Sequence, residues 1–237
     1  MPPKVTVLIP FYNCPYVDRA IESALQQTYP NVEIIVIDDG STEHTTLIQP
    51  YSKHVRCLRK PNGGTASALN MGIRHAGGKF IAWLSSDDLY YADKLESQVA
   101  FMEEHKAEAS FTDFDLIDEA GQLTKESAAA RFSSKLDFFR HLLWGNPING
   151  CTVAITKDLL VKLGLFDEML PFTHDFDMWY RVLLSGTDFH FMDKSTVQYR
   201  KHDRSGSVRH LEQMEREIAF TKARYEPQVI ARIIELQ

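Results

Sequence analysis

Cysteine is scarce in this chain, and this excludes a domain stabilised by disulfides or by a structural zinc ion. Only Cys14, Cys57 and Cys151 occur among 237 residues. Three widely separated cysteines do not make a disulfide framework, and none has the short spacing of a structural zinc site. The sequence therefore indicates a protein of a reducing compartment, stabilised by the ordinary core that 44% hydrophobic residues can build.

Positive charge is also limited. The chain carries 26 Lys and Arg against 32 Asp and Glu, a formal net charge of -6. A general nucleic-acid surface needs a basic stripe, so we expect no nucleic-acid partner. A small phosphorylated ligand in a local pocket stays compatible with this balance.

Long apolar runs are missing as well. The opening residues, MPPKVTVLIP, lack a basic region followed by a cleavable apolar segment. The uncharged stretch 142–156 contains Gly145, Pro147 and Gly150, which rules out a membrane helix there. We expect a cytoplasmic protein that could meet a membrane only peripherally, at the inner face. The mixed-charge C-terminal residues could dock on a membrane or on a second subunit, but they show no strongly basic face.

The glycine-rich phosphate motifs are absent too. The loop after the first apolar run reads FYNCPY, which lacks the GxGxxG of dinucleotide-dependent oxidoreductases and the Lys, Arg or Gly that a triphosphate-binding nucleotidyltransferase wants there. Gly63-Gly64 precedes a predicted helix and could hold a phosphate. A plain turn is the better interpretation of these two glycines, because the stretch matches neither GxGxxG nor GxxxxGK followed by Ser or Thr.

Two adjacent carboxylates are the clearest positive signal. Residues 80–89 read FIAWLSSDDL, an apolar run of strand length followed by Asp87 and Asp88. Adjacent carboxylates at the end of a buried strand repel each other, and a divalent cation between them and an anionic ligand would relieve this. The alternative is a solvated Asp-Asp turn that ends the strand.

A second acidic strand end strengthens the first. Residues 5–9 and 32–37 are apolar, β-branched runs separated by a helical pattern, which predicts a βαβ unit and a parallel sheet. Asp38 and Asp39 follow the second run in the motif DDGST. In parallel sheets, ligands bind beyond the carboxyl ends of the strands. We therefore expect both acidic turns to share one crevice.

The remaining pattern predicts an α/β domain without a linker. We expect helices at 45–51, 65–76 with Thr65 as the cap, 94–105, 135–144, 157–163, and from 209 to 237 with an interruption at Glu226-Pro227. Strands are expected at 55–58, 109–114, 151–155, 189–192 and 197–200, and a polar loop at 118–134. Phe176, Trp179 and Tyr180 share one face of a further helix, which predicts that this helix is deeply buried.

With these motifs in view, the chain resembles family 2 glycosyltransferases of the GT-A fold. The matching pieces are VTVLIPFYN, AIESALQQTYPNVEIIVIDDGSTEHT, NGGTASALNMGIRHAGGKFIAWLSSDD, KLESQ, LGLFDEMLPFTHDFDMWYRVLLSG and YRKHDRSGS. The resemblance implies a mostly parallel central sheet with helices on both faces. It implies one catalytic domain over 1–207, with nucleotide-binding residues 1–90 and acceptor-binding residues 91–207, followed by a helical extension at 208–237.

The resemblance also assigns the nucleotide site. In the family, residues after the first strand and the DDGS turn hold the nucleotide. Carried onto this chain, the nucleotide-binding residues are Pro10, Tyr12, Asn13, Asp38, Asp39, Asn62, Asn70 and Asp87.

A divalent metal, Mn²⁺ or Mg²⁺, follows from the family's Asp-x-Asp-Asp motif. Ser85 stands where the first Asp is usual. We assign Asp88 as the metal ligand and Asp87 to ribose or metal. His202 matches a histidine that reaches the metal or the diphosphate in some relatives, and a solvated loop histidine is the alternative.

The catalytic base of the family lies in a Glu-Asp pair at the start of the buried helix. Here the pair is His174-Asp175, so Asp175 matches the base. A cationic His174 would lower the pKa of Asp175, as the helix N-terminus does. Ordinary acid placement at a helix start is the alternative reading of Asp175 and Asp177.

The implied function is an inverting transfer of a hexose or hexosamine from a nucleotide diphosphate sugar, UDP being the commonest donor in the family. The acceptor would be a hydroxyl of a saccharide, a lipid-linked sugar or another alcohol, in polysaccharide or glycoconjugate synthesis. A second copy of the chain is a candidate partner. The alternatives are an inactive nucleotide-sugar-binding protein of the same fold, which Ser85 and His174 keep open, and a sugar nucleotidyltransferase.

Overall fold

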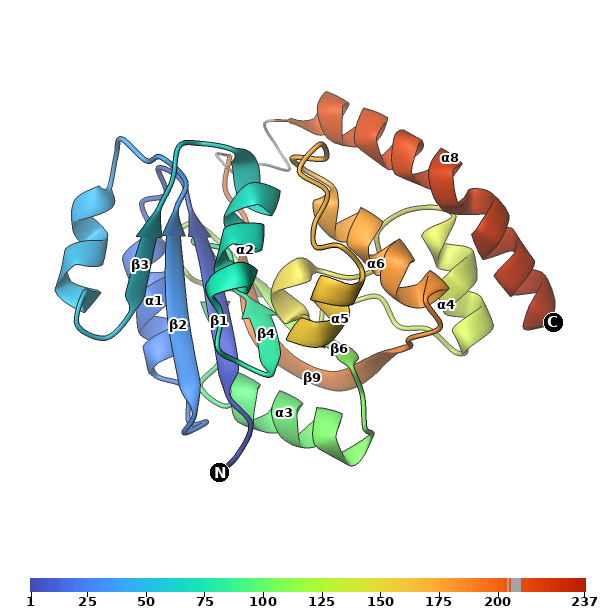
Figure 1. The fold of residues 1–237 in the computed structure, drawn as a ribbon, viewed down its shortest axis with the longest axis horizontal. Coiled ribbons are helices and arrows are strands. Elements are labelled where there is room, and N and C mark those ends of the chain that lie inside the picture. Colours follow the sequence, from blue (N-terminus) through green and yellow to red (C-terminus); the bar gives the residue numbers. More distant parts are fainter. Residues whose placement is uncertain (204, 206–209) are drawn as a thin grey trace.

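The architecture is described from a computed structural model, which covers residues 1–203, 205 and 210–237. A nine-stranded sheet runs through the molecule in the order β3-β2-β1-β4-β8-β6-β9-β5, with β7 paired to β6. Helices cover both faces of this sheet (Figure 1). The α/β class expected from the sequence is confirmed.

The N-terminal half of the sheet is entirely parallel. β1 pairs with β2 on one side and β4 on the other, and β2 pairs with β3. Their registers place Phe11 beside Asp38 and Leu8 beside Trp83, so the loops after β1, β2 and β4 leave the same edge. The bounds are β1 Val5–Phe11, α1 Val17–Leu25, β2 Val32–Asp38, η1 Thr45–Tyr51, β3 Arg56–Arg59, α2 Gly64–His75 and β4 Phe80–Trp83.

Antiparallel pairings appear in the second half. β8 pairs antiparallel with both β4 and β6, while β6 and β9 are parallel neighbours. The bounds are β5 Leu89–Tyr90, α3 Lys94–Glu104, β6 Ala109–Ile117, β7 Leu123–Lys125, α4 Lys135–Leu142, η2 Gly150–Thr152, β8 Ala154–Thr156, α5 Lys157–Lys162, α6 His174–Leu184, β9 Phe189–Arg200 and α8 Leu211–Glu235.

Alternate residues of β1 divide the core between the two faces. Val5, Val7 and Ile9 pack in one cluster with residues of α1 and α3. Leu8 packs in the other cluster, which contains residues of α2, α4, α5, α6 and α8. This alternation is what a strand buried on both faces requires. Figure 1 shows α8 running along the outside of the molecule beside α4 and α6.

Several predicted boundaries were wrong. The two short strands expected at 189–192 and 197–200 are one strand, β9, because register shifts against β6 around Asp113 absorb the polar interruption. Residues 150–152 form a short 3-10 turn before β8. Helix α8 continues through Pro227, and α2 begins after Gly63, with no capping contact from Thr65. The polar loop at 118–134 contains β7.

Parts of three predictions fall outside the described residues. Residues 204 and 206–207 of the matching piece YRKHDRSGS, the boundary between 207 and 208, and Arg209 at the predicted helix start belong to this group. The division into a catalytic domain and a helical extension stays a prediction. Within the described residues, no helix combines the length and apolarity needed to cross a bilayer.

Candidate active site

One large cleft opens at the edge where β1, β2 and β4 end and α6 begins. Its volume is about 1330 Å³. Of the predicted site residues, the cleft is lined by Pro10, Tyr12, Asn13, Asp39, Asp87, Asp175 and His202. The described lining does not include Asp38, Asn62, Asn70 or Asp88.

Asn13 ties the loop after β1 to the loop after β2. Its backbone is in the left-handed region, with φ of 49°, which asparagine tolerates better than most residues. Its Oδ1 accepts hydrogen bonds from Thr42 N (2.8 Å) and Glu43 N (2.9 Å). Asp38 supports the same turn because its Oδ1 accepts from Ser41 N at 2.7 Å. Asp38 therefore shapes this wall from behind, while Tyr12 stands on it, 55% exposed.

Asp39 holds the start of α2 against this wall. Its carboxylate accepts hydrogen bonds from Lys60 Nζ (2.6 Å), Gly63 N (3.0 Å) and Gly64 N (2.8 Å). Gly40 is required next to it, because φ is 78° and a Cβ there would lie 2.7 Å from Asn62 N. The DDGS turn is thus rigid, and Gly63-Gly64 binds a carboxylate of the chain itself.

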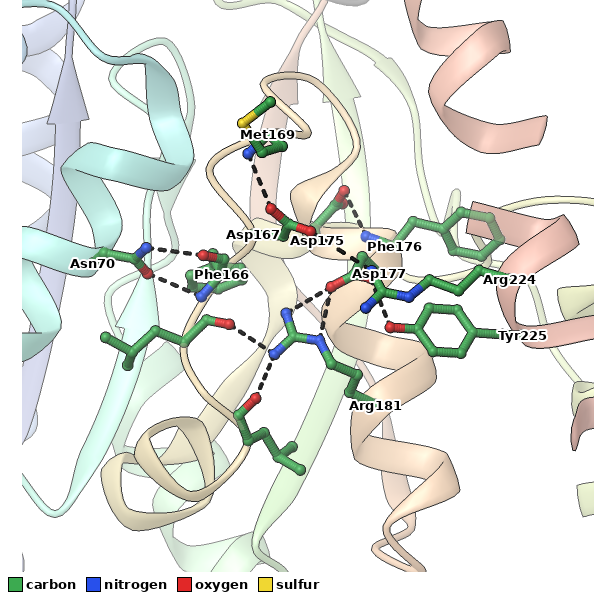
Figure 2. A network of polar contacts seen from close by, with 12 residues as sticks. Asn70, Phe166, Asp167, Met169, Asp175, Phe176, Asp177, Arg181, Arg224 and Tyr225 are labelled. Atoms are coloured by element: carbon green, nitrogen blue, oxygen red, sulfur yellow. Dashed lines mark hydrogen bonds and ion pairs between the residues drawn. The ribbon is translucent and has the colours of Figure 1, made fainter. Parts of the chain in front are cut away.

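The two predicted asparagines lie away from the cleft wall. Asn62 is exposed on the turn before α2. Asn70 is buried, and its amide donates to Phe166 O and accepts from Phe166 N, each at 2.9 Å (Figure 2). The same amide nitrogen also donates to Glu168 Oε1 at 2.9 Å. The polar atoms of Asn70 therefore join α2 to the segment that leads into α6.

Asp87 and Asp88, the acidic pair after β4, make different contacts. Asp88 is 1% exposed, and it accepts hydrogen bonds from Arg200 N (2.8 Å) and Cys151 Sγ (3.1 Å). Burial raises its pKa well above the usual range, and the charge of Asp87 adds to this. Asp87 instead faces the cleft, where its Oδ2 lies 2.9 Å from His202 Nε2.

Arg200 is a site residue that the sequence reasoning missed. It is 1% exposed, and besides its N–H to Asp88 it donates from Nε to the Asp87 carbonyl at 2.9 Å. Its guanidinium carbon also lies 4.6 Å from the centre of the Tyr16 ring. Arg200 thus fixes the acidic turn from β9. The only feature of the sequence that could have indicated this role is the position of Arg200, two residues before His202.

Asp175 also lines the cleft, at the first turn of α6. Asn146 Nδ2 donates to its Oδ2 at 2.9 Å, and Phe176 N donates to its Oδ1 at 2.8 Å. Burial raises its pKa from 3.8 to about 6, although both hydrogen bonds act in the other direction. A carboxyl with this pKa is ionised at neutral pH yet basic enough to accept a proton.

His174 is buried between two aromatic rings. Its ring centroid lies 5.4 Å from that of Trp83 and 5.5 Å from that of Phe166. Burial lowers the pKa of His174 to about 4, and the nearby carbonyls of Leu170 and Pro171 offset only part of that. The histidine is therefore neutral at physiological pH and does not act on Asp175 as a cation would.

Asp177 belongs to the framework rather than the cleft. It is 1% exposed, and it pairs with Arg181 (Nη2, 2.6 Å) and accepts from the Tyr225 hydroxyl (2.8 Å) of α8 (Figure 2). Glu217 of α8 adds a second link, because its Oε2 accepts from Thr173 N at 3.0 Å. Helix α8 therefore holds the end of α6 that carries Asp175.

Comparison with known proteins assigns the family. Residues 6–160 match the family described as "Glycosyl transferase family 2". The chain therefore belongs to glycosyltransferase family 2, a family of transferases.

Individual relatives agree with this assignment. An uncharacterized glycosyltransferase of Rickettsia typhi is 39% identical, over 90% of this chain and 69% of its own length. The UDP-Glc:alpha-D-GlcNAc-diphosphoundecaprenol beta-1,3-glucosyltransferase WfaP of Escherichia coli is 31% identical, over 86% of this chain and 79% of its own. The chain spans only 31% to 58% of the related proteins of four other Rickettsia species.

A solved structure supports the fold. Residues 1–349 of S. aureus TarS, in complex with UDP-GlcNAc, superpose with a TM-score of 0.75 at 21% identity. The match covers 98% of this chain and 71% of that one. The GT-A architecture inferred from the sequence is thereby confirmed.

Proposed function

We propose that the cleft binds a UDP-sugar and transfers its sugar, with inversion, to a hydroxyl of an acceptor. The observation that carries this is that one cleft is lined both by Asp87, which lies beside His202, and by Asp175. Asp87 and His202 suit a diphosphate held through a cation, and Asp175 suits a base. The sugar would lie between them.

Asp175 would act as the general base. The acceptor oxygen attacks the anomeric carbon as Asp175 takes the hydroxyl proton, and the bond from that carbon to the diphosphate oxygen breaks. Attack on the side opposite the diphosphate inverts the anomeric centre. The raised pKa of Asp175, about 6, favours this role, which is typically worth about 10²- to 10⁴-fold in rate.

The walls formed by Pro10, Tyr12, Asn13 and Asp39 would hold the nucleotide. UDP is our choice because WfaP is named for UDP-Glc and TarS structures hold UDP and UDP-GlcNAc. We propose that Tyr12, more than half exposed on the wall, contacts the base. Asp39 contacts base or ribose through the lone pairs that its hydrogen bonds to Lys60, Gly63 and Gly64 leave free.

Asp87 and His202 fit a divalent cation better than Asp88 does. Neighbouring ligand atoms on an octahedral ion with bonds of about 2.1 Å lie about 3 Å apart, and Asp87 Oδ2 and His202 Nε2 are 2.9 Å apart. The described residues contain no cluster of three His, Cys, Asp or Glu side chains suited to an ion. Two protein ligands would therefore be completed by diphosphate oxygens, as is usual for Mg²⁺.

When bound, Mn²⁺ or Mg²⁺ would supply Lewis-acid stabilisation of the leaving diphosphate. In this proposal Asp88 shifts from the ligand predicted from the sequence to a positioning residue. It holds Arg200 N and, through the chain, fixes Asp87.

The acceptor would be a sugar hydroxyl in a cell-surface glycan, including a sugar on a lipid diphosphate, the class that the name of WfaP records. We propose peripheral contact with the membrane that carries such a lipid. A homodimer is a further possibility for the arrangement of the chain in solution.

A UDP-release assay with a panel of UDP-sugars tests the proposal. The chain is incubated with UDP-glucose, UDP-N-acetylglucosamine or UDP-glucuronate and an undecaprenyl-diphosphate sugar, with Mn²⁺ or with EDTA. We expect acceptor-dependent UDP release with at least one donor, and its loss in Asp175→Asn. UDP binding without release by any donor would favour the inactive binding protein instead.

A further inference from the structure

Positive charge is distributed unevenly along the described lining of the cleft. Lys125 and Lys201 are the only lysines in that lining, and it contains no arginine. Both lysines are exposed, and both come from the second half of the chain. Neither ammonium group has a hydrogen-bond or ion-pair partner among the described residues. Two such cations on the wall of a ligand cleft favour an anionic ligand.

The strand register places the two lysines around one patch of the sheet. Leu116 of β6 is paired with Lys125 of β7 on one side and with Tyr199 of β9 on the other. Paired residues point to the same face, and Lys201 follows Tyr199 by two positions, which preserves that face. The ladder reaches Lys201, whose N–H donates to Ile117 O at 2.8 Å. Two strand spacings separate the backbones of Lys125 and Tyr199 by about 10 Å, and long lysine side chains can close on one anion across this span.

The floor of this lysine patch is apolar. Phe114, Leu116 and Tyr199 are half-buried, and all three line the cleft. The rings of Phe114 and Tyr199 meet edge to face, with their centroids 6.1 Å apart. An apolar floor flanked by two cations suits an anionic group that is attached to an apolar chain or ring, because such a ligand also buries apolar surface.

The carboxylates of β6 have other partners. Asp113 pairs with Arg131 Nη2 at 2.6 Å, and Asp115 Oδ1 accepts from Ser195 Oγ at 2.7 Å. Asp115 also lies between the two floor residues of β6, so its side chain leaves the opposite face of the strand. The positive charge of the lysine patch is therefore left for a ligand.

The lysine patch is joined to the proposed base through the second half of the chain. Ala128 N donates to the carbonyl of Phe114 at 2.8 Å. Residues 129–134 then lead to α4, and the turn after α4 carries Asn146, whose amide donates to Asp175 at 2.9 Å. Ala128, Asn146 and Asp175 all line the cleft. The proposed nucleotide residues come instead from the loops after β1 and β2, so the patch belongs with the base and the acceptor.

We propose that Lys125 and Lys201 bind a phosphate or diphosphate group of the acceptor, above the apolar floor of the lysine patch. This inference rests on the proposed function, and it makes the acceptor a phosphorylated substrate whose sugar hydroxyl reacts at Asp175. Lysine binds phosphate as a point charge, so two lysines can hold such a group without a fixed geometry. The donor diphosphate is placed separately, at Asp87 and His202.

The test uses three diphosphates that differ in what is attached to them: UDP, inorganic pyrophosphate and farnesyl diphosphate. Calorimetry gives their dissociation constants for wild type, Lys125→Gln, Lys201→Gln and the double variant. Pyrophosphate and farnesyl diphosphate are titrated into protein saturated with UDP and Mn²⁺, so that the donor site is filled. We expect each single substitution to weaken farnesyl diphosphate binding about two- to fivefold, and the double substitution about tenfold. UDP affinity should stay within twofold.

Two further variants serve as controls. Lys53→Gln replaces an exposed lysine on the turn after η1, outside the cleft lining, and should change none of the three constants. The double variant Lys125→Arg, Lys201→Arg keeps both charges and should retain most of the farnesyl diphosphate affinity, which a merely structural role of the lysine side chains would not require. Raising the salt concentration should weaken wild-type binding of farnesyl diphosphate, because exposed charges are screened.

The inference is overturned if UDP-saturated wild type does not bind farnesyl diphosphate, or binds uncharged farnesol as tightly. Equal affinity of wild type and the double variant for farnesyl diphosphate would also overturn it. An equal loss of UDP affinity in the double variant would assign the lysines to the donor, and pyrophosphate binding as tight as that of farnesyl diphosphate would leave only a general anion site. Failure of the wild type to bind UDP at all would instead overturn the proposed function, so the two failures are told apart.

Discussion

Asn146 donates a hydrogen bond to Asp175 across 2.9 Å, and a backbone N–H sets the orientation of the Asn146 side-chain amide. Ile148 N donates to Asn146 Oδ1 at 3.1 Å, so the Nδ2 end of the amide is the one that faces the carboxylate. The turn after α4 thus contributes a donor that favours the ionised form of the proposed base. This contact opposes the burial that raises the pKa of Asp175.

Removing that donor should move the pH profile. In Asn146→Ala the pKa of Asp175 rises further, because the ionised form loses a hydrogen bond worth about 1 kcal/mol. We expect kcat/KM to fall about threefold at pH 6 and to be nearly unchanged at pH 8. Met169→Ala, an exposed side chain near the start of α6, is the control and should leave the profile unchanged. A loss that is equal at all pH values would contradict the positioning role.

Asp175→Asn should separate activity from stability. Transfer should drop about 10²- to 10⁴-fold while UDP affinity stays within twofold. The carboxyl pKa is raised in the folded state, so its contribution to stability is present below pH 3.8 and is lost as the pH rises through about 6. The variant should therefore have a higher Tm than wild type at pH 8 and an equal one at pH 4, measured by calorimetry. Transfer within a few-fold of wild type would rule out the base.

Most of the N-terminal half of the fold was predictable because β1, β2 and β4 are largely buried on both faces. Such strands appear in the sequence as continuous apolar runs, and β1 and β2 appear in this way. The acidic turns follow those runs directly, so the parallel sheet carries Asp39 and Asp87 to one edge. Local sequence and tertiary structure agree in this region.

Long-range contacts decided the details that the sequence could not provide. Whether Asp87 or Asp88 faces the cleft depends on Arg200, more than a hundred residues further along the chain. The charge state of His174 depends on Trp83 and Phe166, which reach it from other elements. The continuity of α8 through Pro227 reflects a seam of buried residues repeating every four positions: Glu217, Thr221, Tyr225, Val229 and Ile233.

The two adjacent aspartates after β4 should behave differently toward metal. Asp87→Asn removes a carboxylate from the cleft and should abolish the Mn²⁺-dependent increase in UDP affinity, measured by calorimetry with Mn²⁺ and with EDTA. Asp88→Asn keeps an oxygen for the buried Arg200 N–H, and it should retain that increase within about threefold, the range of a single neutral hydrogen bond. The reverse pattern would restore Asp88 as the ligand, and UDP affinity independent of metal in the wild type would remove the metal role.

Asp177, two residues beyond the proposed base, should matter for stability alone. Its carboxylate joins Arg181 of α6 to Tyr225 of α8 with almost no exposure. Asp177→Ala leaves the arginine without its carboxylate partner, and breaking a buried pair in this way costs about 3–5 kcal/mol. Tyr225→Phe removes only a hydroxyl and should cost about 1 kcal/mol. Urea unfolding measures both losses.

Phe220→Ala on the outer face of α8 is the control for this pair. Its side chain is 58% exposed, so its replacement should change the unfolding free energy by less than about 0.5 kcal/mol. The Asp177→Ala protein that remains folded should keep the pH dependence of wild-type transfer, because Asp175 retains Asn146 and the amide of Phe176. A shifted acid limb in Asp177→Ala, with stability near that of wild type, would place Asp177 in the chemistry and move it out of the framework.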